Sequence, residues 1–297
     1  MTLTTVQVRP NGIFPLQNPA SSFDGVTASL DPGFYTTFST LAQGTKVLGL
    51  QAHLDRLYLP ARELKLKPVV EETALRQRIA ELALKNLPRE SRVRLILAKE
   101  HGEMFILSQP FTPLAKEVYE NGVHVVTSTM ERSDPRTKGT DFITKSAEQR
   151  KLVDGGIFEV LLTHNGKILE GMTSNFYAVE YVVASRQAKQ APVVKLITAR
   201  SGILLGVTRR AVLRIARGQG LSIEYRPPLI NEKFDEAFLT SSSRGIVPIV
   251  SIDDVPVGEG RRRAEPVEAV GAWTKTLSQA YQAYVQERSE RIVQESG

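Results

Sequence analysis

The sequence predicts a protein of mixed helix and strand (α/β, or α+β) that is built from two domains. Its 297 residues correspond to two domains at ~150 residues per domain. Its composition, 41% hydrophobic and 24% charged, is typical of soluble globular proteins. Strand and helix signals alternate along the chain, and the composition changes at about residues 110–116 (PFTPLAK). We therefore expect a smaller N-terminal α/β domain over 1–115 and a larger domain over 120–297.

The elements of the first domain follow from local residue patterns. The β-branched and aromatic segment GFYTTFSTL (33–41) predicts a strand, and the turn Gln43-Gly44 followed by KVLGL predicts a hairpin. RVRLILAK (92–99) and MFILS (104–108) predict two more strands. Helices are predicted over about 50–66 and around 75–86, the second ending at Asn86-Leu87-Pro88. Their expected apolar faces contain Leu54, Leu57, Tyr58, Ala61 and Leu64 in the first helix, and Leu75, Ile79 and Leu82 in the second.

The second domain is expected to begin with the strand VHVVTSTM (123–130). A polar loop follows, and Lys145 is expected at the start of a helix that runs to Gly155-Gly156. The dipeptide Asn165-Gly166 between FEVLLTH and KILEG predicts a hairpin, because both residues favour the turn that joins two-residue hairpins. The remaining predictions are a strand at 174–184, a polar connection at 185–192, a helix within 204–220, a strand–turn–strand unit at 237–254 and a last helix from about Val270 with Trp273, Leu277 and Tyr281.

The composition excludes several classes of site. The absence of cysteine rules out disulfides, thiolate nucleophiles, iron–sulfur clusters and Cys-type zinc sites. The four histidines do not show the spacing of metal ligands, so no metal site is expected. No basic segment precedes an apolar run near Met1, and no stretch of ~18 apolar residues occurs, which predicts a cytoplasmic protein without a membrane segment. The net charge of +6 is spread along the chain apart from Arg261-Arg262-Arg263, so we expect no nucleic-acid partner.

Four segments contain groups suited to chemistry. Lys145 and Glu170 each follow a loop or a hairpin strand, and the helix start Gly206–Arg209 presents backbone N–H groups that favour anions. The hydroxyl-rich turn at 240–245 offers hydroxyls and N–H groups to a phosphate or a carboxylate. Taken one at a time, each is equally consistent with a solvated surface segment. Together they indicate an enzyme-like α/β protein with anion sites.

The order of these segments resembles the fold-type IV pyridoxal-phosphate (PLP) enzymes, which include branched-chain aminotransferases, D-amino-acid aminotransferases and aminodeoxychorismate lyases. The resemblance extends from about Gly33 to Leu277 and is strongest at LEGMTSNF (169–176), which matches an E-G-x-x-S-N-x-F strand. It further includes GFYTTF (33–38), HLDRL (53–57), ITKS (143–146), GVTR (206–209) and the segment from Phe238 to Ile249. The family fold implies that PLP lies between a small and a large domain.

The resemblance also implies roles for individual residues. Lys145 would form a Schiff base with the cofactor aldehyde and move the substrate proton. Glu170 would hold the pyridine nitrogen protonated, because a nearby carboxylate favours the charged ring. The cofactor phosphate would be bound by one guanidinium and by hydroxyl and backbone N–H donors, which are Arg56, Val207, Thr208 and Ser242.

Two departures from the family leave parts of the site open. Branched-chain enzymes have a tyrosine facing the ring O3′ at the position where this chain has Arg150, so Arg150, Lys138 or Arg136 would supply a cation there. The arginine and histidine that trap the substrate carboxylate in D-amino-acid enzymes have no counterpart in the short segment 99–103. We therefore expect the substrate to contact Tyr35, Ser243 and Arg244.

The function implied is that of a PLP-dependent aminotransferase, which moves an amino group between an amino acid or amine and a 2-oxo acid. The family also implies a homodimer. Two alternatives stay open at this stage: a lyase of the aminodeoxychorismate type, favoured by Tyr35-Thr36-Thr37, and a non-catalytic PLP-binding protein. The residues do not specify the amino donor or its L or D configuration.

Overall fold

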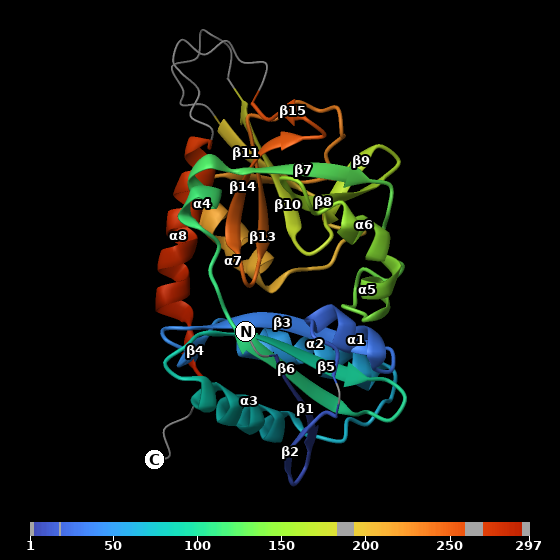
Figure 1. The fold of residues 1–297 in the computed structure, drawn as a ribbon. Helices are drawn as coiled ribbons and strands as arrows, with labels where there is room; N and C mark the ends of the chain where they lie inside the picture. The colour runs from blue at the N-terminus through green and yellow to red at the C-terminus, as the bar shows by residue number, and fades with distance from the viewer. Residues whose placement is uncertain (1–2, 18, 183–192, 259–269, 293–297) are drawn as a thin grey trace. The chain divides into compact units, whose positions relative to one another are not determined.

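The structure is a computed structural model that describes residues 3–17, 19–182, 193–258 and 270–292 (Figure 1). The chain forms two compact units. Unit 1 contains the described residues of Met1–Pro113, Thr137–Lys145 and Val285–Gly297, and unit 2 contains those of Leu114–Arg136 and Ser146–Tyr284. Both units mix helices with strands, which confirms the predicted fold class. The predicted polar connection at 185–192 and Arg261-Arg262-Arg263 lie outside the described residues.

Unit 1 is built on a sheet whose described strands follow the order β16-β4-β3-β5-β6-β1-β2. The described strand pairs in it are antiparallel. The predicted strands are β3, β5 and β6, and β4 pairs antiparallel with β3 in the predicted hairpin, whereas β1 and β2 had not been predicted. The bounds are β1 Thr4–Arg9, β2 Gly12–Pro15, β3 Gly33–Leu41, β4 Lys46–Val47, β5 Ser91–Ala98, β6 Met104–Pro110 and β16 Glu290–Arg291, with helices α1 Phe23–Ser29, α2 Leu50–Glu63, α3 Glu72–Asn86 and α5 Asp141–Lys145.

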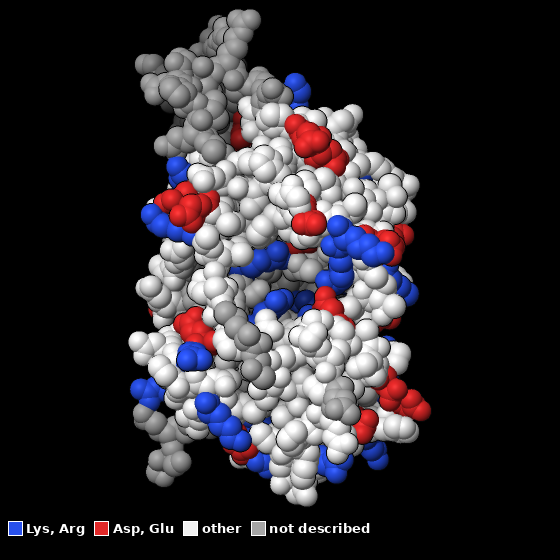
Figure 2. Space-filling model, in the orientation of Figure 1, with Lys and Arg blue, Asp and Glu red and all other residues white. Residues whose placement is uncertain are grey.

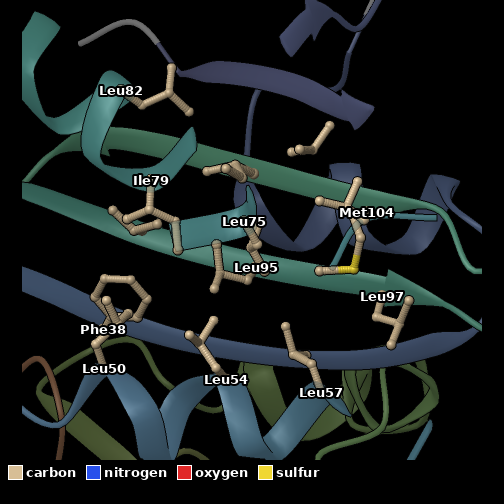
Figure 3. Close-up of a cluster of buried hydrophobic side chains, with 14 of the residues drawn as sticks. Phe38, Leu50, Leu54, Leu57, Leu75, Ile79, Leu82, Leu95, Leu97 and Met104 are labelled. Carbon is tan, nitrogen blue, oxygen red and sulfur yellow. The ribbon is translucent and has the colours of Figure 1, made fainter. Parts of the chain in front are cut away.

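One face of this sheet is covered by α2 and α3. Figure 3 shows Leu50, Leu54 and Leu57 of α2 in one cluster with residues of α3 and of the strands. Alternate residues of β5 face the cluster, as the period of a strand requires. The predicted apolar face of α2 is confirmed except at Leu64, whose prediction was wrong: it is 60% exposed. Helix α2 ends at Glu63, and Lys65 adopts a left-handed φ of 55°, so Leu64 follows the last helical turn and is not on the buried face.

The opposite face of the sheet is covered by α1 and α5. Ile143 of α5 packs with Tyr35 and Phe23 in a second apolar cluster. The chain that leads into α5 is held against β3 by reciprocal bonds, because Thr140 N–H donates to Gly33 O at 2.9 Å and Gly33 N–H donates to Thr140 Oγ1 at 2.8 Å. These contacts fix the backbone that ends at Lys145.

Unit 2 is built on a mixed sheet whose described strands follow the order β12-β11-β10-β13-β14-β7-β8-β9, with β15 paired to β14. Strand β7 pairs in parallel with both β8 and β14. The strand bounds are β7 Val123–Ser128, β8 Ile157–His164, β9 Lys167–Gly171, β10 Asn175–Val182, β11 Val193–Thr198, β12 Ser222–Tyr225, β13 Glu236–Ser241, β14 Gly245–Ile252 and β15 Val255–Pro256. The helices are α4 Lys116–Asn121, α6 Ala147–Lys151, α7 Val207–Gly218 and α8 Ala272–Arg288, the last of which continues into unit 1.

Most predicted elements of the second half are confirmed. The hairpin β8–β9 turns at Asn165 and Gly166, whose φ angles of 49° and 71° are those of the predicted turn. Two expectations were wrong. Helix α4 precedes β7, so the strand is not the first element. Lys145 lies at the end of α5, because the buried Ser146 separates α5 from α6 and the predicted single helix is broken in two.

The surface offers no large area of one charge on the face drawn in Figure 2, where basic and acidic side chains are interspersed. Across residues 3–17, 19–182, 193–258 and 270–292, no helix is both long and apolar enough to cross a membrane. Within the same residues, no group of three or more His, Asp or Glu side chains is placed to hold a metal ion.

Candidate functional site

Helix α7 begins with backbone N–H groups that no side chain of its N-cap residue satisfies. The N-cap is Gly206, where an added Cβ would lie 2.2 Å from Asn175 Oδ1. Asn175 is buried and donates through Nδ2 to Leu204 O at 2.8 Å. A side chain at position 206 would therefore displace the start of α7. The N–H groups of the first turn lie at the positive end of the helix dipole, where an anion is stabilised.

Two predicted phosphate ligands from separate segments lie together at this helix start. Thr208 Oγ1 donates to Ser242 Oγ at 3.4 Å, which joins α7 to the turn between β13 and β14. Burial raises the pKa of Tyr281, so its phenol stays neutral beside Thr208, to which it hydrogen-bonds. Val207, the neighbouring predicted ligand, is half-buried on the first turn of α7. Hydroxyl and N–H donors thus gather where an oxyanion would be stabilised.

The buried side chain of Arg209 joins α7 to the end of β11. Its side chain is buried, and its two terminal nitrogens donate to Thr198 Oγ1 at 2.7 Å and to Ala199 O at 2.6 Å. Thr198 Oγ1 in turn donates to Phe176 O at 2.8 Å. Both guanidinium contacts point into the end of β11, so this arginine anchors the anion-binding turn and does not face an anion itself.

Glu170 is buried on β9 and is held by two donors. Its Oε1 accepts from Arg132 Nε at 2.7 Å, and its Oε2 accepts from Leu204 N–H at 3.0 Å. The side chains of Arg132 and Glu170 are 4% and 2% exposed, so this ion pair is removed from water. A buried carboxylate with an arginine partner and a fixed orientation is suited to hold a proton on a neighbouring base.

Arg244 pairs with a buried carboxylate that was not among the predicted site residues. Its Nη2 donates to Glu159 Oε2 at 2.9 Å and also to Thr173 Oγ1, and its Nε donates to Ser241 Oγ at 3.1 Å. The guanidinium lies 5.2 Å from the Phe158 ring centroid. Ser243, the residue before it, is half-buried in the same turn. Arg244 is therefore directed along the turn toward β8, and its charge is shared with Glu159.

Lys145 is exposed at the end of α5 in unit 1. Its Nζ donates to Asp141 Oδ2 at 2.8 Å, one helical turn earlier. This ammonium group holds the pKa of the Asp141 carboxyl below its ordinary value, and Lys99 adds a smaller effect of the same sign. Because Ile143 and the Gly33–Thr140 contacts fix the helix, the primary amine projects from a rigid support.

Tyr35 and Lys138 also lie together in unit 1. Tyr35 N–H donates to Lys138 O at 2.9 Å, and the Lys138 ammonium lies 4.9 Å from the Tyr35 ring centroid. The guanidinium of Arg94 lies 4.9 Å from the same centroid. Tyr35 is buried, so its ring is a fixed platform with two cations against it.

The other predicted cations occupy different settings. Arg56 is half-buried on α2, next to the core residue Leu57, and belongs to unit 1. Arg150 is half-buried on α6 and donates through Nε to Ser146 Oγ at 3.2 Å. Arg136 is 87% exposed and pairs with Asp134. Of the three candidates for the ring O3′, Arg136 is thus the most exposed.

Sequence reasoning missed Arg132 and Glu159. Arg132 is one of two arginines in the same polar loop, and nothing in the local pattern distinguishes it from the exposed Arg136. Glu159 occupies an otherwise apolar strand and is 2% exposed. A carboxylate within FEVLL was a signal that a buried partner cation exists, because an unpaired charge is costly in a core.

The residues present fit PLP. Unit 2 contains an uncapped helix start with two hydroxyls, which suits a phosphate, and a buried carboxylate paired with an arginine, which suits a pyridinium nitrogen. Unit 1 contains an accessible primary amine on Lys145, which suits an aldehyde. The N-cap Gly206 has no side chain that could accept from the N–H groups of the helix start, and a Cβ there would collide with Asn175 Oδ1.

Comparison with known proteins gives a consistent result. The model of the family described as amino-transferase class IV matches residues 33–252. The chain is 27% identical over 252 residues to the D-alanine aminotransferase of Bacillus licheniformis, which covers 78% of this chain and 81% of the relative. It is 28% identical over 181 residues to the branched-chain-amino-acid aminotransferase of Escherichia coli K12, which covers 57% of this chain and 52% of the relative. The solved structure of the branched-chain aminotransferase of the archaeon Thermoproteus uzoniensis with norvaline shares the fold, with a TM-score of 0.72, 19% identity and 99% of both chains covered.

Proposed function

The chain belongs to the class IV aminotransferase family, and on this premise we propose that it transfers an amino group between an amino acid or amine and a 2-oxo acid, with PLP bound covalently at Lys145. The observation that carries the proposal is the meeting of Thr208 and Ser242 at the uncapped start of α7. These two residues were predicted as phosphate ligands from segments that lie more than thirty positions apart in the sequence. A fold that brings them together supports a cradle for a phosphate ester.

PLP, when bound, supplies an aldehyde carbon for covalent attachment and a ring that accepts an electron pair. Lys145 would hold the cofactor through its Nζ, and the freed amine would be the group that moves a proton at the substrate Cα. Glu170 would hold a proton on the ring nitrogen, since a carboxylate beside it favours the charged form. The residues that would hold the phosphate are those that the family resemblance implies: the N–H groups of Val207 and Thr208, the hydroxyls of Thr208 and Ser242, and Arg56.

The substrate side of the proposal rests on Tyr35, Ser243 and Arg244. Tyr35 presents a fixed aromatic wall in unit 1. Ser243 and Arg244 belong to the turn that also contains Ser242, so a carboxylate would meet backbone N–H groups, a hydroxyl and a guanidinium there. The names of the relatives, one a D-alanine aminotransferase and one a branched-chain-amino-acid aminotransferase, support D-alanine or branched-chain amino acids as candidate substrates.

A homodimer is part of the same proposal. A two-fold pair is the commonest assembly of soluble enzymes, and the family that the sequence resembles is dimeric. The cytoplasmic location stays a prediction of the sequence.

A half-reaction screen tests the proposed function. The PLP-loaded protein would be mixed with a panel of L-amino acids, D-amino acids and amines, and the absorbance of the cofactor would be followed. We expect conversion to pyridoxamine phosphate with at least one donor and return to PLP on adding a 2-oxo acid. Release of pyruvate without this conversion would favour the lyase, and no spectral change with any donor would favour a non-catalytic PLP-binding protein.

A further inference from the structure

Arg132 is a buried arginine in the loop that follows β7. Its Nε donates to Glu170 Oε1 at 2.7 Å, and its Nη2 donates to Met172 O at 2.9 Å. One guanidinium therefore contacts both the carboxylate on β9 and the backbone two residues further on. Since these contacts use a planar, rigid donor fork, they fix the direction of the Glu170 side chain and the path of the chain after it.

The second oxygen of Glu170 is held from a different segment. Leu204 N–H donates to Oε2 at 3.0 Å, and Leu204 lies two residues before Gly206 at the start of α7. The carboxylate is removed from water, because the Glu170 side chain is 2% exposed and that of Arg132 is 4% exposed. A carboxylate in such surroundings retains its charge only with a compensating cation, which Arg132 supplies.

We propose that Arg132 is a positioning residue for the aminotransferase reaction: it orients Glu170 and keeps it a weak base, so that a proton shared between Glu170 and the pyridine nitrogen of PLP resides on the nitrogen. The inference rests on the proposed function, in which Glu170 faces that nitrogen. A carboxylate without a cation would compete for the proton and leave the ring neutral. The guanidinium prevents this, because an adjacent positive charge favours the ionised carboxylate.

The first test concerns the ion pair in the cofactor-free protein. Thermal unfolding would be compared for the natural chain, Arg132→Met, Glu170→Gln and the double variant. Arg132→Met leaves a buried carboxylate without its cation, and we expect its Tm to fall by about 5 °C or more. The double variant lacks this charge, so its Tm should be higher than that of Arg132→Met. An unchanged Tm for Arg132→Met would overturn the pairing on which the proposal depends.

The second test measures the proton on the ring. The holoenzyme would be prepared with PLP that is ¹⁵N-labelled at the pyridine nitrogen, whose NMR chemical shift differs strongly between protonated and neutral rings. We expect the protonated position in the natural chain and a shift toward the neutral position in Arg132→Met. In Arg132→Lys the ¹⁵N chemical shift should lie between those of the natural chain and Arg132→Met. The ammonium group restores the positive charge but cannot reach both acceptors.

A matched control removes a different arginine of unit 2. Arg226 is about one-third exposed and pairs with Glu224 and Glu232, so Arg226→Met also breaks an ion pair but leaves Glu170 intact. Its ¹⁵N shift should equal that of the natural chain. A protonated ring in Arg132→Met, together with a lower Tm, would reduce Arg132 to a purely structural role and overturn the proposal.

Failure of the proposed function can be told apart from failure of this inference. Borohydride labelling of the natural chain reports whether PLP is attached at Lys145, whereas the Tm comparison needs no cofactor. Attachment at Lys145 combined with an Arg132-independent ¹⁵N shift rejects the inference alone. Absence of attachment at Lys145 rejects the function on which it rests.

Discussion

Arg244 and Glu159 form an ion pair in which Nη2 and Oε2 are 2.9 Å apart, with the carboxylate buried and the guanidinium one-fifth exposed. The pair joins the turn after β13 to β8. The guanidinium reaches the surface on one side and is anchored on the other. A ligand carboxylate that binds at the turn would therefore meet a cation whose direction is fixed by Glu159 and Thr173.

The fixed direction of the Arg244 guanidinium leads to a prediction for Arg244→Ala. We expect the variant to raise the KM of an amino acid more than that of the matched amine without a carboxylate, since only the former loses a charged partner. Steady-state kinetics with both substrates measure this. Because Glu159 would lose its cation, Arg244→Ala/Glu159→Gln serves as the control without an unpaired buried charge. Equal effects on both substrates, or none, would remove Arg244 from the carboxylate site.

Replacement of Glu170 by Gln tests the role of its charge. The amide retains the size of the side chain but does not hold the ring nitrogen protonated, so the rate should fall by orders of magnitude at ~1.4 kcal/mol per tenfold. The dissociation constant of PLP should change little, because the proposed phosphate ligands Thr208 and Ser242 do not include Glu170. Turnover measurements and a PLP titration give both quantities. A rate near that of the natural chain would mean that another group contacts the ring nitrogen.

The Asp141–Lys145 pair predicts a pH dependence of stability in the cofactor-free protein. The ammonium of Lys145 holds the pKa of the Asp141 carboxyl below its ordinary value. A depressed pKa stabilises the folded state above the unfolded value of ~3.9, and this contribution is lost as the pH falls through the folded value. Thermal unfolding of the natural chain and Asp141→Asn should therefore differ slightly at neutral pH and converge in acid. A difference that grows as the pH falls would contradict the pairing. The effect is small because both side chains are about half exposed.

The proposed assembly predicts a mass in solution. Light scattering at micromolar concentration should give at least twice the 32.9 kDa of one chain. An active protein that scatters as a single chain would show that one copy is sufficient for the reaction.

Local signals account for what the sequence predicted correctly. Asn165-Gly166 specifies its turn by backbone preference alone, and the spacing of Leu54, Leu57 and Ala61 defines a helix face without knowledge of its partner. Motif order supplied Thr208 and Ser242, and their meeting at 3.4 Å is consistent with it. The turn and the helix face depend on neighbours in the chain, which a sequence displays directly. Thr208 and Ser242 are distant in the chain and were predicted from the family resemblance.

The residues that were missed depend on distant partners. Glu159 and Arg244 are separated by 85 positions, and Arg132 and Glu170 by 38, so neither pairing has a local pattern. The helix break at Ser146 has the same origin, because Ile143 and Thr140 are fixed by contacts with the sheet of unit 1 and not by helix propensity. Tertiary packing therefore decided what local preference could not.

Borohydride reduction of the PLP-loaded protein, followed by peptide mass mapping, tests the central claim most directly. Reduction makes the attachment of the cofactor to its lysine permanent, and the account predicts the label on Lys145. Lys145→Ala should carry no label and should lose multiple-turnover activity, because it lacks the amine that we propose binds the cofactor at the end of α5. A label on Lys138 or Lys167 in place of Lys145 would contradict the account.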